Sequence, residues 1–257
     1  MNKILLLTLL MFSFVSNGNT QDIEKAFDTI KFSNQLELAD WLVEYEYYTQ
    51  PALDKLSMDM DISTTEWFSY KANNTWNIVG GIITGNTFRI TKHITIDSLD
   101  NIADYIGECD SSMLNSSGLA LSQAETHFQI VRDTSSMYFS SFVHRNSDQT
   151  ISIWFLPALQ HSGQAIYGCE WEYVFDKTGL NLLMSKPFTN VVTGVWIGQP
   201  RELWLNYRNT DAPTVGSLFF AQSFRDYFTR IRVDTKISTS TISKDSKGNY
   251  SWNHKLK

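Results

Sequence analysis

The 257 residues are 42% hydrophobic and 19% charged, the composition of an ordinary globular protein, and a mean hydropathy of −0.22 argues against a membrane protein. Without residues 1–20, whose only charge is one lysine, the formal charge is 20 − 27 = −7. That is the wrong sign for a protein that binds phosphate backbones, so no nucleic-acid partner is expected.

The first twenty residues have the parts of a cleavable secretory signal in the right order. A basic start at Lys3 precedes an apolar run from Ile4 to Val15, which is shorter than the roughly 20 residues of a membrane span. A buried N-terminal helix is the alternative, but the run offers only two hydroxyl side chains for a polar face. Cleavage after Gly18 fits, and no cysteine for lipid attachment lies nearby. We expect a secreted or periplasmic protein without a membrane span, in which residues 21–257 form a single domain.

The N-terminal part of the mature chain is predicted to be helical. Asn34 and Glu37 have capping-box spacing, and apolar residues recur at helical intervals, which predicts a helix over residues 33–48. Pro51 suits the first turn of a second short helix through Leu56. A small acidic cluster follows, made up of Asp54, Asp59, Asp61 and Glu66. It lacks the Gly and the terminal Glu spacing of a helix-loop-helix calcium site, so we expect a solvated turn.

From Glu66 the pattern changes to strands. Three β-rich runs separated by turn residues predict a meander: 66–70, 76–83 and 88–96. A helix over residues 98–106 is expected to follow, with Gly107 as its C-cap. A capping box at Ser122 and Glu125 predicts another helix that ends before Ser135.

Antiparallel hairpins dominate the rest of the chain. Residues 137–144 and 150–156 predict one, and residues 167–175 and 180–184 predict another across a turn with Asp176 and Gly179. The same Asp-to-Gly spacing at Asp245 and Gly248 predicts a terminal hairpin between 232–242 and 249–254, after a helix over 220–231. Helices mostly in the first half and antiparallel pairs in the second define an α+β fold, with N-terminal helices packed on a mainly antiparallel sheet built from hairpins and a meander.

The two cysteines are Cys109 and Cys169. An even count in an exported chain predicts a disulfide, which would close a loop of about 60 residues and contribute roughly 4 kcal/mol in the chain-entropy model. Two buried thiols are the alternative. Cys169 has no positively charged sequence neighbour that would favour a reactive thiolate.

Local motifs for catalysis or cofactor binding are absent from the sequence. The five histidines are scattered, without a His-Glu-x-x-His pair, and there is no Gly-x-Ser-x-Gly elbow or phosphate-binding loop, so neither a metal nor a cofactor is predicted. The candidates for a catalytic site assembled from distant positions are His144 and His161, which flank a predicted hairpin, with Glu170 and Glu172.

Aromatic residues make up 14% of the chain, including eight tryptophans. In the pairs Trp67-Phe68 and Trp154-Phe155 adjacent strand residues face opposite sides of a sheet. Burial of both sides under helices is the interpretation we favour, and a stacking platform for sugars or peptides is the alternative. Sequons at Asn73, Asn115 and Asn249 fall in predicted loops and matter only in a eukaryotic secretory pathway.

These observations favour an exported, non-catalytic binding module for a protein or small ligand in the cell envelope or the extracellular space. An exported hydrolase that uses the histidines and glutamates above is one alternative. A structural envelope component that self-associates is another.

Overall fold

The computed structural model describes residues 27–57, 66–132, 137–157, 163–189, 192–197 and 201–257. The predicted signal, Asp59, Asp61 and His161 lie outside the described residues. The described residues are about 29% helical and 43% strand, with mostly antiparallel sheets, which confirms the α+β fold. It divides into two compact units, unit 1 with residues 1–39 and 198–257 and unit 2 with residues 40–197. The single domain over 21–257 stays a prediction.

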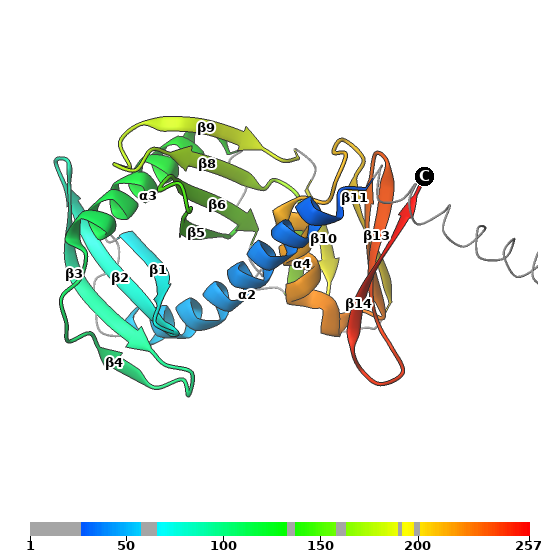
Figure 1. The fold of residues 1–257 in the computed structure, drawn as a ribbon, viewed down its shortest axis with the longest axis horizontal. Coiled ribbons are helices and arrows are strands. Elements are labelled where there is room, and N and C mark those ends of the chain that lie inside the picture. Colours follow the sequence, from blue (N-terminus) through cyan, green and yellow to red (C-terminus); the bar gives the residue numbers. More distant parts are fainter. Residues whose placement is uncertain (1–26, 58–65, 133–136, 158–162, 190–191, 198–200) are drawn as a thin grey trace, which may run out of the picture. The chain divides into compact units, whose positions relative to one another are not determined.

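Most of the elements are strands (Figure 1). In chain order they are α2 (Thr29–Ser57), β1 (Glu66–Ala72), β2 (Thr75–Thr84), β3 (Thr87–Ile96), β4 (Ile102–Asp104), α3 (Ser111–Val131), β5 (Phe139–Arg145), β6 (Ile151–Pro157), β7 (Gln164–Tyr167), β8 (Trp171–Phe175), β9 (Leu182–Pro187), β10 (Thr193–Trp196), β11 (Glu202–Tyr207), α4 (Val215–Phe224), the 3-10 helix η2 (Arg225–Tyr227), β12 (Arg230–Thr235), β13 (Ser238–Lys244) and β14 (Tyr250–Leu256).

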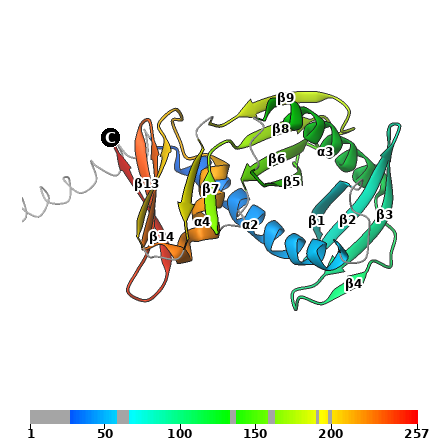
Figure 2. The same cartoon turned by 180° about the vertical axis from the view of Figure 1, so that it is seen from behind.

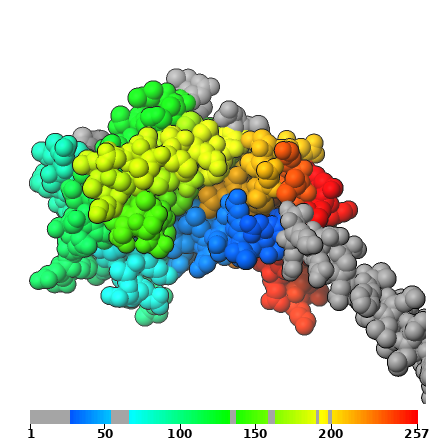
Figure 3. Space-filling model, turned by 45° about the horizontal axis from the view of Figure 1, so that its top comes forward, coloured from blue at the N-terminus to red at the C-terminus, as the bar shows by residue number. Residues whose placement is uncertain are grey.

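Unit 2 is built around α3, which lies between two four-stranded sheets (Figure 1). One sheet has the order β1-β2-β3-β4 and the other β5-β6-β8-β9, and both are antiparallel. Strand β9 is the outer strand of its sheet and lies at the surface in the yellow-green region of Figure 3. Side chains from the helix and both sheets share one core, which includes Phe68, Val79, Phe88, Leu121, Phe128, Ile153, Phe155 and Tyr173.

The C-terminal part of α2 covers the face of the second sheet that is turned away from α3. Its Tyr45 ring packs against Phe142 of β5 and Trp76 of β2, with ring centroids 5.2 and 5.6 Å apart. Trp154 and Phe155, on opposite faces of β6, are only 2% and 4% exposed. Burial on both sides of this strand is therefore confirmed, and this aromatic pair forms no exposed platform.

Tyr45 also joins the two sheets of unit 2 through its hydroxyl. The backbone N–H of Ser69 in β1 donates to this oxygen at 2.8 Å, and a second hydrogen bond links it to the backbone of Val143 in β5. Complete burial strongly raises the pKa of the Tyr45 hydroxyl. The neutral phenol is thus a fixed polar link inside the core.

Unit 1 contains the sheet β11-β12-β13-β14. Strands β11 and β12 are parallel and are connected through α4, which lies alongside the sheet in both ribbon views (Figure 2), and the other pairs are antiparallel. At β14 the start of α2 covers one face of the sheet, where Phe27 stacks on His254 with centroids 4.1 Å apart and Phe32 packs on Trp252. The terminal hairpin predicted around Asp245 and Gly248 is confirmed.

Several helix predictions are wrong in their extent. Residues 33–48 and 51–56 belong to the single helix α2, which contains Pro51. The proline lies near the C-terminal end, where its ring removes only one backbone hydrogen bond. The predicted helix over 220–231 is instead α4 followed by η2 and then by the start of strand β12.

Residues 98–106 form a turn and strand β4 rather than the predicted helix. The Asp97 carboxylate accepts hydrogen bonds from the backbone of Leu99 and Asn101 and closes the turn. Leu99 and Ile106, which would share the apolar face of such a helix, are 79% and 96% exposed. A helix here would bury no apolar face, and packing of such a face is what stabilises most short helices in proteins.

Helix α3 begins eleven residues before the predicted capping box. Its N-cap is Asp110, whose side chain accepts a hydrogen bond from the backbone N–H of Met113. Ser122 and Glu125 therefore lie in mid-helix. The sequon residue Asn115 is also inside α3, which contradicts its predicted loop position, whereas Asn73 and Asn249 lie in turns.

The predicted disulfide between Cys109 and Cys169 is wrong, because the two residues are not near each other and form no disulfide. Cys109 precedes α3 and packs against the core between the sheets. Cys169 lies in the left-handed turn between β7 and β8, with φ of 55°. Their separate elements place the two sulfurs apart, so the even cysteine count was misleading.

Candidate functional site

The catalytic candidates of the sequence lie in separate, largely buried settings. The His144 ring packs edge-on against Trp41 with centroids 4.7 Å apart, and its Nδ1 is 3.2 Å from Asn146 Oδ1. Burial lowers the pKa of His144. Glu170 is buried, and one of its carboxylate oxygens accepts a hydrogen bond from the backbone of Gly168.

The structure does bring His144 and Glu172 to the same face of the second sheet of unit 2. Both adjoin Trp154, which lies 6.1 Å from the His144 ring and directly opposite Glu172 in the strand register. Burial raises the pKa of Glu172, an effect that the charge of Lys186 partly offsets. The buried indole of Trp154 occupies the space beside both side chains, and neither of them lines the cleft found elsewhere in unit 2.

This cleft, of about 580 Å³, opens at the N-terminal end of α3. It is lined by Asn86, Asp110, Ser112, Met113, Asn115, Ser116, Leu119, Arg145, Gln149, Lys177, Thr178 and Leu180. Apart from the residues of α3 and its cap, these side chains come from the last residue of β5, Arg145, and from three hairpin connections, β2–β3, β5–β6 and β8–β9. Two different sheets and one helix thus converge on a single volume.

Close backbone packing fixes the β8–β9 turn against α3. Gly179 has φ of +73°, and a Cβ there would lie 2.0 Å from the carbonyl oxygen of Ser116. The side-chain amide of Gln123 also donates to the Gly179 carbonyl at 2.8 Å. Only glycine combines this conformation with this approach, and the result is a firm position for Lys177 and Thr178 at the rim.

Arg145, at the end of β5, is held in place by neutral groups. Its Nη2 donates to Ser116 Oγ at 2.5 Å, and its Nη1 donates to the carbonyl and side-chain oxygens of Gln149 at 3.4 and 3.3 Å. Among the described residues no carboxylate lies within ion-pair distance of Arg145 or Lys177, and the buried Nε of Arg145 has no hydrogen-bond partner. The guanidinium is ordered while its charge is not neutralised.

Asp110 is the one carboxylate in the lining, and it caps α3. With two cations against this one engaged carboxylate, and with the positive end of the α3 dipole close by, the cleft carries a local excess of positive charge. Neutral hydrogen-bonding groups surround the cations, and Met113, Leu119 and Leu180 supply an apolar side. The lining suits a small anionic molecule that also has polar and apolar parts.

The rest of the cleft wall is positioned by contacts between α3 and β3. Asn115 Oδ1 accepts a hydrogen bond from the backbone N–H of Phe88 at 2.7 Å. A Cβ on Gly118 would lie 2.4 Å from the Phe88 ring, so the missing side chain lets helix and strand approach closely. These contacts join residues far apart in sequence, and no local motif marked Arg145 or Lys177 as functional candidates.

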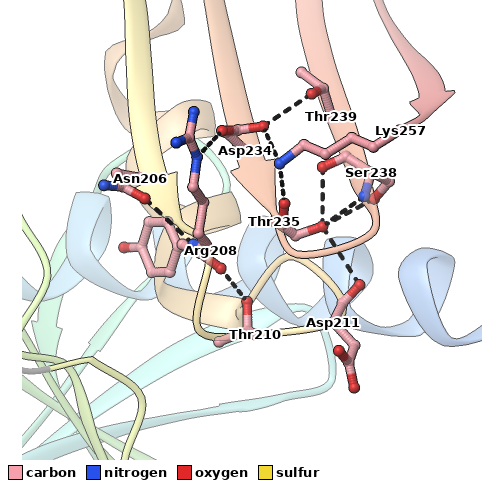
Figure 4. Close-up of polar contacts among 10 residues, drawn as sticks. Asn206, Arg208, Thr210, Asp211, Asp234, Thr235, Ser238, Thr239 and Lys257 are labelled. Carbon is pink, nitrogen blue, oxygen red and sulfur yellow. Dashed lines mark hydrogen bonds and ion pairs between the residues drawn. The ribbon is translucent and has the colours of Figure 1, made fainter.

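A second polar cluster lies in unit 1 at the carboxyl end of β12 (Figure 4). Asp234 is buried and accepts from Arg208 Nε at 2.6 Å, Lys257 Nζ at 2.7 Å and Thr239 Oγ1 at 3.0 Å. Burial alone would raise the pKa of Asp234, but hydrogen bonds from these three side chains outweigh that effect and lower it. The carboxylate is saturated by its own chain, so this cluster holds the strand ends together rather than offering a vacant site.

Three further glutamates of unit 2 have no cationic partner among the described residues, and two of them are in contact with each other. Glu125 on α3 hydrogen-bonds to Glu66 at the start of β1, and burial together with this carboxylate raises the pKa of Glu125. Glu46 on α2 accepts from Ser140 Oγ at 2.8 Å, and burial raises its pKa as well. Two carboxyl groups in contact share one proton more readily than they bear two charges.

Comparisons with family models, with curated proteins and with solved structures found no match to this chain. Within the described residues there is no set of three or more His, Cys, Asp or Glu side chains placed to hold a metal ion. No helix in this part of the chain has both the length and the apolar character needed to cross a bilayer.

Proposed function

We propose that the chain is an exported, non-catalytic binding module that takes a small anionic ligand in the cleft at the start of α3. The observation that carries this proposal is the pairing of Arg145 and Lys177, two cations without a carboxylate partner among the described residues, in one cleft of about 580 Å³. That volume is in the range of small-molecule sites.

The arrangement of Arg145 supports binding better than catalysis. Contacts from Ser116 and Gln149 preorganise the guanidinium, so a carboxylate or phosphate group would be bound at little cost in side-chain entropy. The lining holds no histidine, cysteine or second carboxylate that could serve as base or nucleophile beside Asp110. Export rests on the signal-like residues 1–20, so the ligand would be met in the envelope or outside the cell.

Isothermal titration of the mature chain tests the proposal. The probes are inorganic phosphate, glucuronate and glucose 6-phosphate, with neutral glucose as the uncharged control. We expect at least one anion to bind and glucose not to bind. Arg145→Gln and Lys177→Gln should each weaken binding of that anion about tenfold or more, because each removes one charge contact.

Lys247→Gln is the matched control. Lys247 lies in the Asp245–Gly248 turn, which has the same Asp-to-Gly spacing as the turn of Lys177 but lies in unit 1. This variant should bind like the wild type. Failure of every anion to bind, or equal affinity of the Arg145 variant and the wild type, would refute the proposed site.

A further inference from the structure

The sheet of unit 1 comes from a basic part of an acidic chain. Residues 201–257, which supply all four of its strands, contain ten Lys and Arg and five Asp and Glu, so their formal charge is 10 − 5 = +5. Residues 21–200 contain ten Lys and Arg and 22 Asp and Glu, a formal charge of 10 − 22 = −12. Such a charge asymmetry within one chain indicates that the basic part meets an anionic partner.

The cations gather on one face of this sheet, which we call the open face. In β11 the apolar residues are buried and the alternate residues are exposed, and the start of α2 packs on the buried face at β14. The strand register and the ion pairs place seven charged side chains on the open face or in contact with it, five cations and two carboxylates, a net side-chain charge of 5 − 2 = +3. They are Arg208, Arg230, Arg232, Lys255, Lys257, Glu202 and Asp234.

At one end of β12 a single carboxylate holds two arginines beside an exposed indole. Glu202 binds Arg230 at 3.0 Å and Arg232 at 3.1 Å, and the Arg232 guanidinium lies 4.5 Å from the ring centroid of Trp204. Two cations on one carboxylate keep one positive charge. Trp204 is 50% exposed, so the guanidinium orients the indole while half of the residue stays open to solvent.

At the other end of β12 a second carboxylate is shared in the same way. Asp234 binds Arg208 at 2.6 Å and Lys257 at 2.7 Å (Figure 4). The Arg208 side chain is 71% exposed, and Lys255, also on the open face, forms no ion pair among the described residues. Positions 230 and 234 are four residues apart in one strand, so the cations follow β12 for about 13 Å.

We propose that the open face binds an acidic polysaccharide, with Trp204 stacked on a sugar ring and the cations on its carboxylate or sulfate groups. Arginine matches the planar, two-oxygen geometry of a carboxylate, and a fixed indole offers an apolar surface to the carbons of a sugar ring. A row of cations along one strand suits a polymer with repeated anionic groups better than a single small anion. The site is separate from the anion cleft, which lies in unit 2.

Three other anionic partners fit less well. Single-stranded nucleic acid is bound by stacking successive bases on several aromatic side chains, whereas the open face presents one. A membrane surface requires apolar side chains that enter the lipid, but the neighbours of Trp204 on this face are Glu202, Asn206 and Arg232. A second copy of the chain would have to bind with its acidic part, and the centre of a protein interface is depleted of charged residues.

Affinity electrophoresis of the mature chain in gels that contain polygalacturonate, alginate or heparin tests the proposal, with hydroxyethyl cellulose as the neutral comparison. We expect at least one acidic polymer to retard the protein, less so at higher ionic strength, and the neutral polymer not to retard it. Trp204→Ala should lose about tenfold or more in affinity, and Trp204→Phe, which keeps a ring, should lose less. Lys255→Gln, which breaks no ion pair among the described residues, should lose about threefold.

Two matched controls should bind like the wild type. Lys247→Gln removes a cation of unit 1 that lies in the β13–β14 turn, and Trp196→Ala removes an indole that is 57% exposed but lies in β10 of unit 2. Arg145→Gln should also bind like the wild type, which distinguishes failure of the anion cleft from failure of this face. Circular dichroism of each variant establishes that a loss of binding is not a loss of folding.

The same proteins are tested against a single-stranded DNA oligonucleotide, against vesicles of phosphatidylglycerol, and for self-association by sedimentation. The proposal is overturned if no acidic polysaccharide retards the protein, or if Trp204→Ala binds as tightly as the wild type. It is also overturned if the DNA or the vesicles bind more tightly than every polysaccharide. Self-association that Lys255→Gln weakens, without retardation by any polysaccharide, would assign the open face to a second copy instead.

Discussion

The stability of unit 2 should fall as the pH rises from 5 to 8, and Glu125 should account for much of that fall. Folding places Glu125 in a largely buried site against the Glu66 carboxyl, which raises the pKa of Glu125 from 4.5 to about 8. The folded state then holds a proton that the unfolded state has already released. Its contribution to stability is complete below pH 4.5 and is lost as the pH rises through about 8.

The size of the effect follows from linkage. Each pH unit in which the folded state holds one extra proton costs about 1.4 kcal/mol, so the contribution of Glu125 between pH 5 and pH 8 is about 3 kcal/mol. Glu125→Gln keeps a neutral hydrogen-bond donor beside Glu66 and removes the titration. Between pH 5 and pH 8, the free energy of unfolding of the variant should fall by about 3 kcal/mol less than that of the wild type. At pH 8 the variant should be the more stable of the two.

Urea unfolding at pH 5, 6, 7 and 8, followed by tryptophan fluorescence, measures the difference. Glu46 and Glu172, whose pKa values are also raised by burial, add a slope of the same sign, whereas His93 and His144, whose pKa values burial lowers, add one of the opposite sign. All four groups are present in both proteins, so the difference between the variant and the wild type reports Glu125. Glu108→Gln is the control, since Glu108 is exposed in the loop before α3, and it should reproduce the wild-type pH profile. Parallel profiles for the Glu125 variant and the wild type would refute the shared-proton interpretation.

Two further predictions concern backbone packing and the link between the sheets. Gly179→Ala should lose more than 3 kcal/mol in urea unfolding, since its Cβ would meet the Ser116 carbonyl oxygen at 2.0 Å. Gly248→Ala, which also has a left-handed φ but whose Cβ would make only an ordinary contact with Lys244 at 3.8 Å, should lose about 1 kcal/mol. Equal losses in the two variants would contradict the clash at Gly179. Tyr45→Phe should lose about 1–3 kcal/mol in the same assay, because it leaves the buried N–H of Ser69 without its acceptor, and unchanged stability would show that this hydroxyl does not join the sheets.

Turn residues and strand alternation were enough to predict the hairpins and the burial of Trp154 and Phe155 on opposite faces of their strand. The turns at Asp176 and Asp245 have the expected left-handed glycines, with the Gly179 and Gly248 backbone N–H groups donating to the aspartate carbonyls. The same turn occurs with Gln149 in the left-handed position, where the sequence carries no glycine to mark it. The alternation of apolar and polar residues from Glu202 to Tyr207 also indicates that Trp204 faces outward.

The start of α3 shows where local patterns fail. Residues 111–118 are rich in serine, asparagine and glycine, which favour turns and caps over helix interiors. They are helical because Leu114 and Gly118 are buried between two sheets, and Gly118 packs directly on Phe88. Burial against partners distant in sequence outweighs a helix-propensity cost of about 0.5–1 kcal/mol for each serine, asparagine or glycine.

The sequence by itself determined the α+β class, the hairpins with their glycine turns, and the two-sided burial of the Trp154–Phe155 strand, because each depends on neighbours within a few residues or on strand alternation. Only the tertiary structure shows that Cys109 and Cys169 lie apart and that Arg145 and Lys177 line the same cleft. Those relations depend on how two sheets pack around a central helix. Such packing is set by the summed burial of many distant side chains and leaves no local spacing to recognise.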